Sequence, residues 1–331
     1  MTRFTWLVLL LLCCLAAVAF LGITLNSPYS AFNQETFVEF PRGTGIREMA
    51  AKLESAGVIH HWWAFLMARA IRRGAKLKAG EYRFTAHATV LDVYDRIARG
   101  DIFYYELVVP EGKNMFDIAA AVEKLDVFSA VRFLEAARDP TPIRDLDPDA
   151  PTLEGYLFPD TYRLSRGATP DGLCLMMTGR FRAVWHGLHT DASVHRTVTL
   201  ASLVEKEGKL AAERSIIASV FARRLALGMR LDCDPTTIYA AVLDGSYGGT
   251  IHRSDLDSDN PYNTYRHAGL PPGPIANPGL ASIMAALHPA DTDYLYFVAR
   301  ADGSGGHNFS SDLAAQEVNI GKYRKAVASR P

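Results

Sequence analysis

The chain has 331 residues and a mass of 36.4 kDa, a length typical of about two domains. A hydrophobic share of 49% and a charged share of 21% exclude a disordered or collagen-like protein. The 35 basic and 36 acidic residues leave a formal charge of −1 and no dense basic patch, which argues against a nucleic-acid partner. The mean hydropathy of +0.01 is high for a soluble protein, and the apolar excess is concentrated in the first 25 residues.

Residues 4–25 form an apolar segment of 22 residues without a charge. As a helix this segment would span about 33 Å, enough to cross a hydrocarbon core of about 30 Å. Arg3 precedes the segment and Glu35 is the first charge after it. The positive-inside rule then predicts a cytoplasmic tip at 1–3, a transmembrane anchor at 4–25, and the rest of the chain on the other side of the membrane.

A cleaved signal peptide is the alternative interpretation of this segment. Residues 17–19 (Ala-Val-Ala) fit a cleavage site that follows a short apolar region. The apolar run continues to Leu25, however, and this length favours an uncleaved anchor. Both interpretations place the bulk of the chain outside the cytoplasm.

The four cysteines add one expectation. Cys13 and Cys14 lie in the apolar segment, which leaves Cys174 and Cys233 in the rest of the chain. Two cysteines this far apart in sequence do not make a disulfide framework. We expect Cys174 and Cys233 to be unpaired core thiols.

A short pattern occurs twice after a polar tether at 26–35. Pro-Arg-Gly at 41–43 and Pro-Glu-Gly at 110–112 are each preceded by a strand-like segment and followed by an amphipathic helical pattern. A strand-turn-helix unit of this size cannot bury its own apolar face. We therefore expect both copies to pack within one small α+β domain at 36–138.

Further elements are predicted between and after the two copies. A helix begins at Trp62, a strand covers 78–84 and another helix covers 90–99. Residues 139–151, rich in Pro and Asp, predict an exposed linker, and a larger domain follows at 152–325. The predicted fold class is therefore α+β, preceded by a transmembrane helix.

Common catalytic and metal-binding motifs are missing from the sequence. It contains no G-x-S-x-G elbow, P-loop or H-E-x-x-H. His186 and His189 share a helical face but lack a carboxylate or a third ligand, so we expect no metal site. The glycine-rich 302–306 lies between two strand-like segments and indicates a hairpin turn rather than a phosphate loop.

The segment Thr197–Gly208 (TVTLASLVEKEG) carries the most chemical information. It predicts a helix with Thr197 as N-cap, on which Glu207 continues the apolar stripe of Leu200, Leu203 and Val204. Glu205 lies about 200° round the helix, so the two carboxylates cannot form a close pair. Burial would raise the pKa of Glu207 and suit it to general acid catalysis.

The alternative for Glu207 is a structural glutamate at the edge of the core. Such a residue would be paired with an arginine, and Arg214, Arg223 and Arg224 are the candidates in the following segment. The helical pattern alone does not decide between the two readings.

Several segments, in order along the chain, resemble the endolytic murein (peptidoglycan) transglycosylases, the YceG-like family. The similarity covers nearly everything after the apolar segment, and 79–84 resembles the family's LysM-like N-terminal part. The segments that carry the resemblance are 153–162 (LEGYLFPDTY), 201–208 (ASLVEKEG), Glu213-Arg214, 219–240 (SVFARRLALGMRLDCDPTTIYA), 262–265 (YNTY), 269–275 (GLPPGPI), 277–279 (NPG), 286–290 (ALHPA), 294–298 (YLYFV) and 306–309 (GHNF).

The resemblance implies a lyase that acts on peptidoglycan without a cofactor. The second glutamate of the E-K-E triplet, here Glu207, would protonate the glycosidic oxygen between N-acetylmuramic acid and N-acetylglucosamine. The same carboxylate would then deprotonate the muramic C6 hydroxyl as it attacks C1, which leaves a 1,6-anhydro end. The family usually has Thr or Ser after the catalytic glutamate, and this chain has Gly208.

The resemblance also implies surroundings for the enzyme. The protein would sit in the inner membrane by one helix, with its catalytic domain in the periplasm, and would cut nascent glycan strands beside cell-wall synthases. Residues of the matching motifs are candidates for sugar contacts, each with the alternative of supporting a turn or the core. These candidates are Glu154, Tyr156, Asp160, Tyr162, Asp234, Thr236, Tyr239, Asn263, Thr264 and Tyr265.

Two other functions remain open from the sequence. A peptidoglycan glycoside hydrolase would need a second carboxylate or a held water near the bond. A non-enzymatic wall-binding scaffold would use the LysM-like domain alone.

Overall fold

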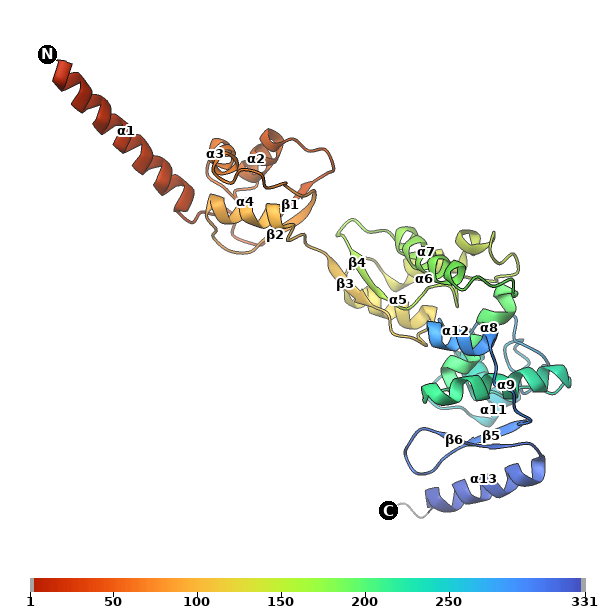
Figure 1. The fold of residues 1–331 in the computed structure, drawn as a ribbon. Helices are drawn as coiled ribbons and strands as arrows, with labels where there is room; N and C mark the ends of the chain where they lie inside the picture. Colours follow the sequence, from red (N-terminus) through yellow and green to blue (C-terminus); the bar gives the residue numbers. More distant parts are fainter. Residues whose placement is uncertain (1–2, 329–331) are drawn as a thin grey trace. The chain divides into compact units, whose positions relative to one another are not determined.

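The computed structural model describes residues 3–328, so the predicted tip at 1–3 falls largely outside the described residues. The chain divides into two compact units between Tyr105 and Glu106. Within the described residues the sheets are two-stranded, β1 with β2, β3 with β4 and β5 with β6, and helices supply most of the remaining regular structure (Figure 1). The predicted α+β class is confirmed at this level.

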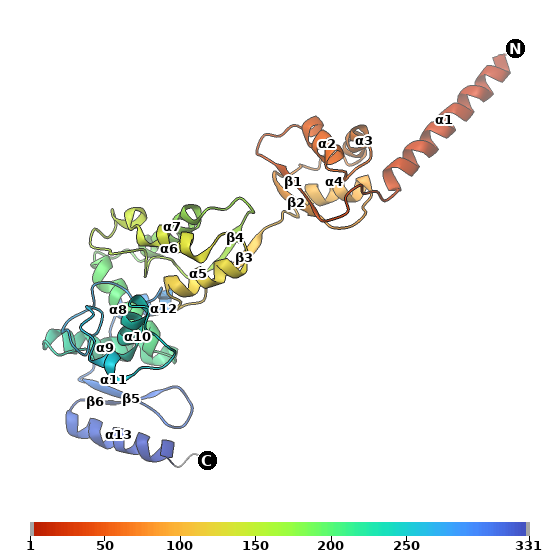
Figure 2. The ribbon, with the colours of Figure 1, turned by 180° about the vertical axis from the view of Figure 1, so that it is seen from behind.

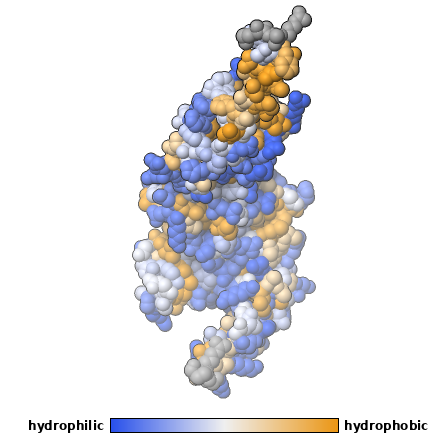
Figure 3. Space-filling model, turned by 90° about the vertical axis from the view of Figure 1, so that its left-hand side faces the viewer, coloured by the Kyte–Doolittle hydropathy of each residue, from blue (hydrophilic) through white to orange (hydrophobic). Residues whose placement is uncertain are grey.

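Helix α1 (Arg3–Asn26) forms the predicted apolar helix. Its segment Phe4–Asn26 is long and apolar enough to cross a membrane, and a signal sequence would have the same properties. Its large apolar side chains are exposed from Phe4 to Ile23, and Figure 3 shows them gathered over this helix. Near its end, Leu25 is buried and packs with the first unit.

The rest of the first unit follows the predicted order of elements, a strand, two helices, a strand and a helix. Strands β1 and β2 pair antiparallel, with Thr36 opposite Phe84 and Phe40 opposite Gly80. Helix α4 begins at a capping box in which Thr89 and Asp92 bond each other's backbone N–H. The elements are β1 (Thr36–Phe40), α2 (Ile46–Ser55), α3 (Trp62–Ile71), β2 (Gly80–Phe84) and α4 (Val90–Arg99).

The predicted tether at 26–35 is not a free linker. The N–H of Tyr29 donates to the carbonyl of Ala88 at 3.0 Å, and the N–H of Ala31 donates to the carbonyl of Gly57 at 2.8 Å. The segment is therefore attached to the first unit by backbone hydrogen bonds, which its polar composition did not indicate.

The second unit is built around helix α8, which packs against α9 and α12. The hairpin β5–β6 is antiparallel, with Ala299 opposite His307, and α13 lies along it in both ribbon views (Figures 1 and 2). This pairing confirms the predicted hairpin at 302–306. The elements are β3 (Tyr105–Val108), α5 (Met115–Lys124), α6 (Ala130–Arg138), η1 (Thr141–Ile143), β4 (Thr161–Leu164), α7 (Pro170–Gly187), α8 (Val194–Glu207), η2 (Ala211–Glu213), α9 (Arg214–Ala226), α10 (Asp234–Leu243), α11 (Arg253–Leu256), α12 (Leu280–Leu287), β5 (Tyr296–Ala299), β6 (His307–Ser310) and α13 (Leu313–Ala328).

The two strand-turn-helix copies form as predicted, but they do not share a domain. Strand β3 pairs with β4 of the second unit rather than with β1 or β2. The turn of the second copy is held there as well, because the N–H of Gly112 donates to the carbonyl of Asn277 at 2.9 Å. The division after Tyr105 thus differs from the predicted boundary at 138. A local sequence repeat therefore predicts which elements form, but not the sheet in which each strand pairs.

The predicted exposed linker at 139–151 is packed into the second unit. Ile143 is fully buried, and the carboxylate of Asp147 accepts hydrogen bonds from Tyr156 and His195. The guanidinium of Arg182 in α7 donates to the carbonyl of Pro142 at 2.6 Å. Pro140, Ile143, Asp147 and Ala150 thus anchor the segment to the second unit, while its other Asp side chains stay exposed.

We predict opposite effects of two glycine-to-alanine changes in the second unit. Gly155 has φ +90°, and a Cβ there would lie 2.4 Å from Pro274 Cγ and 2.9 Å from Val198 Cγ1. Gly155→Ala should destabilise the protein by about 2 kcal/mol or more, through strain and overlap with a rigid ring. Gly179 in α7 has open space around it, so Gly179→Ala should stabilise by about 0.5–1 kcal/mol. Chemical denaturation of the detergent-solubilised variants measures both changes in the free energy of unfolding. Equal changes in the two variants would contradict the fold around Gly155.

Candidate active site

Helix α8 carries Glu207 as its last residue. Ser193, not Thr197, is the N-cap, and its Oγ accepts from the N–H of Arg196 at 3.3 Å. Thr197 is buried one turn into the helix. The predicted cap was wrong because Ser193 and the residues after it extend the helix by one turn. The helix ends at Gly208, whose N–H donates to the carbonyl of Val204 at 2.7 Å.

Glu207 opens onto a cavity of about 340 Å³ within the second unit. This volume is in the range of small-molecule sites. The lining comes from α8, α9, the start of α10, the hairpin β5–β6 and α13, and it combines aromatic, acidic and basic side chains. The lining residues are Glu207, Arg224, Leu231, Asp232, Asp234, Tyr265, Phe297, Val298, Ala299, His307 and Tyr323.

The carboxyl group of Glu207 is held in a form suited to an acid. Burial raises its pKa, and the charge of Asp234 raises it further, whereas the Cys233 thiol and His307 lower it. The thiol donates to Oε1 at 3.4 Å. Within the described residues Glu207 makes no ion pair, so the alternative of an arginine-paired core glutamate is not what the structure shows.

Glu205 uses the cations and donors that Glu207 lacks. Its carboxylate accepts from Arg214 at 3.3 Å and from the N–H of Gly279, before α12, at 3.0 Å. The two glutamates therefore face different neighbours, as the helical spacing predicts. Arg224 is also engaged elsewhere, with carbonyl groups of the chain and with Asp232.

Two of the predicted sugar-contact residues reach the cavity. Asp234 and Tyr265 both line it, and the Tyr265 hydroxyl donates to Asp234 Oδ1 at 2.6 Å. The bond holds the carboxylate and the phenol together at the start of α10. These two residues remain our candidates for contact with a ligand.

Three others are buried behind this wall and hold it in shape. Thr264 Oγ1 accepts from the N–H of Cys233 at 3.0 Å and bonds Thr236 Oγ1 at 2.9 Å. The amide of Asn263 donates to the carbonyls of Asp255, Leu256 and Ser258. All three side chains are 0–1% exposed, so they fix the loop before Tyr265 rather than meet a ligand.

The remaining five predicted contacts, Glu154, Tyr156, Asp160, Tyr162 and Tyr239, do not line the cavity. Glu154 is 1% exposed and accepts from the N–H of Met115, the hydroxyl of Tyr239 and the amide of Asn277. Burial raises the pKa of Glu154 to about 8. These groups form an internal polar network that joins α5, α10 and the loop before α12.

Tyr156, Asp160 and Tyr162 likewise have partners within the protein. The Tyr156 and Tyr162 hydroxyls, both on buried side chains, donate to Asp147 and to the carbonyl of Phe158. Asp160 is exposed and pairs with Arg180 at 2.7 Å. The expectation that these residues meet sugar has no support from the cavity.

Sequence reasoning missed several lining residues. His307, Phe297 and Tyr323 come from the C-terminal hairpin and helix, and Asp232 precedes α10. The signal for His307 was present, because 306–309 (GHNF) is one of the segments that carry the family resemblance. Its interpretation as a hairpin alone overlooked the side chain.

The profile of the YceG-like family matches residues 38–322. The chain belongs to this family. A protein of Bacillus subtilis (strain 168), named endolytic murein transglycosylase, is 33% identical over 304 residues, which cover 85% of this chain and 84% of that protein. A Streptococcus pneumoniae (strain ATCC BAA-255 / R6) protein of the same name is 30% identical over 298 residues. That match covers 79% of this chain and 54% of the pneumococcal protein, so the chain spans about half the length of that relative.

A solved structure supports the same assignment. The crystal structure of a yceG-like protein from Listeria monocytogenes is similar with a TM-score of 0.55 and 31% sequence identity. The similarity covers 86% of this chain and 99% of the Listeria chain. Fold and sequence thus agree over most of the molecule.

Gly208 of this YceG-like protein fits its place without a hydroxyl. A Cβ there would lie 2.9 Å from both Arg214 Cγ and the Val204 carbonyl oxygen. The Arg214 guanidinium also donates from Nε to the carbonyl of Gly208 at 3.3 Å. The space that a Thr or Ser side chain would take is therefore occupied by the arginine that binds Glu205.

The two cysteines outside α1 are free and buried, as expected. Cys174 lies in α7, and burial raises the pKa of its thiol to about 12. Cys233 lies behind Glu207, so it serves as a weak donor to the carboxyl group.

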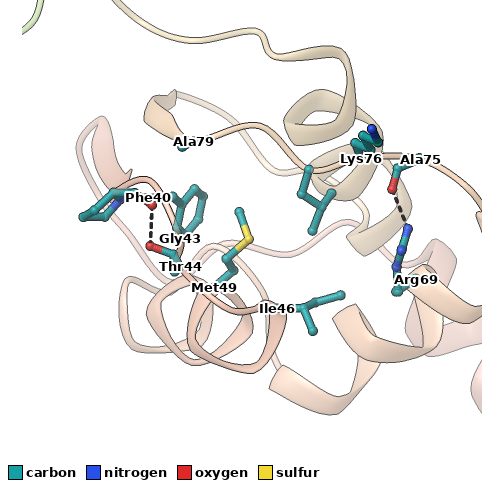
Figure 4. Close-up of a pocket in the computed structure, with 11 residues that line it drawn as sticks. Phe40, Gly43, Thr44, Ile46, Met49, Arg69, Ala75, Lys76 and Ala79 are labelled. Carbon is teal, nitrogen blue, oxygen red and sulfur yellow. Dashed lines mark hydrogen bonds between the residues drawn. The ribbon is translucent and has the colours of Figure 1, made fainter.

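A second cavity, of about 410 Å³, lies in the first unit (Figure 4). It lies between the turn after β1 and the segment before β2, and Arg69 and Lys76 are the charged residues of its lining. The Arg69 guanidinium donates to the carbonyl of Ala75. No carboxyl group lines this cavity, in contrast to the cavity at Glu207.

We predict that Asp234→Asn lowers the pKa of Glu207. The Asp234 charge opposes ionisation of Glu207, and asparagine removes it while its Oδ1 can still accept from Tyr265. Asp232→Asn, a matched change in the same cavity, should leave the Glu207 titration unchanged. Carboxyl ¹³C NMR of glutamate-labelled protein measures the titration, and Glu207→Gln identifies the signal. Equal shifts in the two variants would contradict the assigned electrostatics.

Proposed function

We propose that this protein is a membrane-anchored lytic transglycosylase that cuts peptidoglycan strands internally. The observation that carries the proposal is Glu207, a partly buried carboxyl group with a raised pKa and without an ion pair, on the wall of a cavity of small-molecule size. The relatives named endolytic murein transglycosylases support the choice of substrate. A carboxyl group with a raised pKa is what an acid that cleaves a glycosidic bond requires.

Glu207 performs both proton transfers in the proposed reaction. Its carboxyl proton goes to the oxygen between N-acetylmuramic acid and N-acetylglucosamine as the C1–O bond breaks. The carboxylate then takes the proton of the muramic C6 hydroxyl, whose oxygen bonds to C1 and closes the 1,6-anhydro ring. Glu207 ends protonated, and no water is consumed. The internal hydroxyl replaces the activated water of a hydrolase, so no second carboxylate is needed.

The walls of the cavity suit a sugar chain. Tyr265, Phe297 and Tyr323 offer aromatic faces to sugar C–H groups, and Asp234 offers acceptors to hydroxyl groups. Asp234 and Tyr265 are the two sugar contacts predicted from the sequence that we retain in this proposal. The proposed catalytic domain comprises the second unit, and the first unit is a LysM-like module that precedes it.

The location follows from α1. We propose an uncleaved anchor in the inner membrane, with the N-terminus in the cytoplasm and both units in the periplasm. Nascent glycan strands leave their synthases at this surface. An anchored enzyme there would release strands or set their length.

Glu207→Gln should reduce glycan cleavage at least 100-fold and leave binding to purified sacculi intact. The amide cannot donate the acid proton, and losses of about 10²–10⁴ are typical for a general acid. Glu317→Gln, the same change at an exposed residue of α13, is the control and should retain full activity. Mass spectrometry of the products reports their ends.

The product ends separate the competing functions. Anhydro ends made by the wild type support the lyase, whereas reducing ends would identify a hydrolase. Binding without cleavage by the wild type would identify a scaffold. Full activity of Glu207→Gln would overturn the assignment of the acid.

The anchor has its own test. The protein isolated from membranes should retain residues 1–25 by intact mass and should resist extraction at alkaline pH, because an apolar helix of this length stays in the bilayer. A shorter mass that begins after Ala19, with the protein released to the soluble fraction, would show a cleaved signal peptide instead.

A further inference from the structure

A glutamate–histidine pair stands beside Glu207, and the mechanism above does not use it. Glu213 lies in η2, six residues after Glu207, and His307 begins β6. The imidazole Nδ1 lies 2.9 Å from Glu213 Oε2, and both side chains are 9% exposed. His307 also lines the cavity into which Glu207 opens. The connection that follows the catalytic helix thus reaches across to the hairpin.

The carboxylate of Glu213 is held by several donors at once. The backbone N–H of His307 donates to both of its oxygens, at 3.1 and 3.0 Å. Arg300 approaches Oε1 at 3.5 Å. Gly306 allows this approach, because a Cβ at that position would lie 2.9 Å from Glu213 Oε1. Such a cradle fixes where the carboxylate lies and therefore how it orients the ring.

The pairing determines which ring nitrogen is available to the cavity. An ionised carboxylate only accepts hydrogen bonds, so it keeps a proton on Nδ1. Nε2 has no hydrogen-bond partner within residues 3–328. Phe297 packs edge-on against the ring, with centroids 5.3 Å apart.

We propose that His307, held by Glu213, is a positioning residue for Glu207: when protonated, it presents an Nε2–H donor to the cavity that stabilises the Glu207 carboxylate between its two proton transfers. This inference rests on the proposed function of Glu207. In that reaction the carboxylate exists only while the glycosidic bond is broken and the anhydro ring is open. A donor fixed in advance stabilises it without reorganisation.

Within the described residues, the other charged groups around the cavity leave the Glu207 carboxylate without another stabilising cation. Asp234 opposes the charged form of Glu207, whereas His307 favours it. Arg224 is engaged by carbonyl groups and by Asp232, so it is not free to serve Glu207. The titratable and charged groups that face this space are Glu207, Cys233, Asp232, Asp234, Arg224, Tyr265, His307 and Tyr323, with Glu213 and Arg300 behind the imidazole.

Two substitutions of His307 test the roles of its two ring nitrogens separately. Asparagine can keep the donor to Glu213 but has nothing at the position of Nε2, so His307→Asn should lower kcat about 10–100-fold with little change in KM. In this variant Glu207 should titrate at higher pH, because the positive charge that stabilises its carboxylate is lost. The basic limb of the pH–activity profile should shift to higher pH as well. Glutamine can place an amide near the position of Nε2, so His307→Gln should recover at least about threefold of the lost rate.

The outcomes are distinguishable. An unchanged rate and profile in His307→Asn would overturn the inference. Equal losses in both variants, with lowered melting temperatures and an unmoved Glu207 titration by carboxyl ¹³C NMR, would show a merely structural role and would also overturn it. Failure of the wild type to make anhydro ends would instead overturn the proposed function. The NMR titration of Glu207 in His307→Asn tests the link between the two residues even in that case.

Discussion

The ion pair between Glu205 and Arg214 is the constraint on which the site depends. It neutralises Glu205, which lies two residues before Glu207 on a different side of α8, and Glu205 also accepts from the N–H of Gly279 before α12. Arg214 in turn bonds the carbonyl of Gly208, so the end of α8 is fixed on two sides. Glu207 faces the cavity on another side of the helix and makes no ion pair within the described residues.

A partly buried carboxyl group without an ion pair, such as Glu207, has a cost for folding. Burial raises the pKa of Glu207 in the folded state above its unfolded value, so its contribution to stability is most favourable below the ordinary carboxyl range and is lost as the pH rises through the raised value. The surrounding apolar core offsets this cost, since Leu203 and Val204 of α8 and Phe221 of α9 are almost fully buried. Cys233 gives only a weak hydrogen bond. Because Glu207 lies at the end of a well-packed helix, the unfavourable burial of its carboxyl group is confined to the end of α8.

Local patterns predicted the elements well and their partners poorly. The helical spacing of Leu200, Leu203 and Val204 placed Glu207 on the side opposite Glu205, because that relation depends on one helix alone. The two strand-turn-helix copies formed, yet the second pairs with β4, a choice made by contacts far apart in sequence. Buried polar groups such as Glu154 gave no local signal, because a glutamate whose side chain is satisfied by three internal donors looks the same in the sequence as one that meets a ligand.

The division of the site along the chain explains why sequence reasoning found only part of it. Glu207 and Asp234 lie on either side of α9, whereas His307 and Tyr323 come from the last fifth of the chain and meet them only through the packing of α13 along the β5–β6 hairpin. That hairpin is fixed to the catalytic connection by Glu213, which binds the backbone and the ring of His307. The bond that assembles the cavity is therefore also the bond that orients its imidazole. One carboxylate therefore holds both the backbone of the hairpin and the imidazole that lines the cavity.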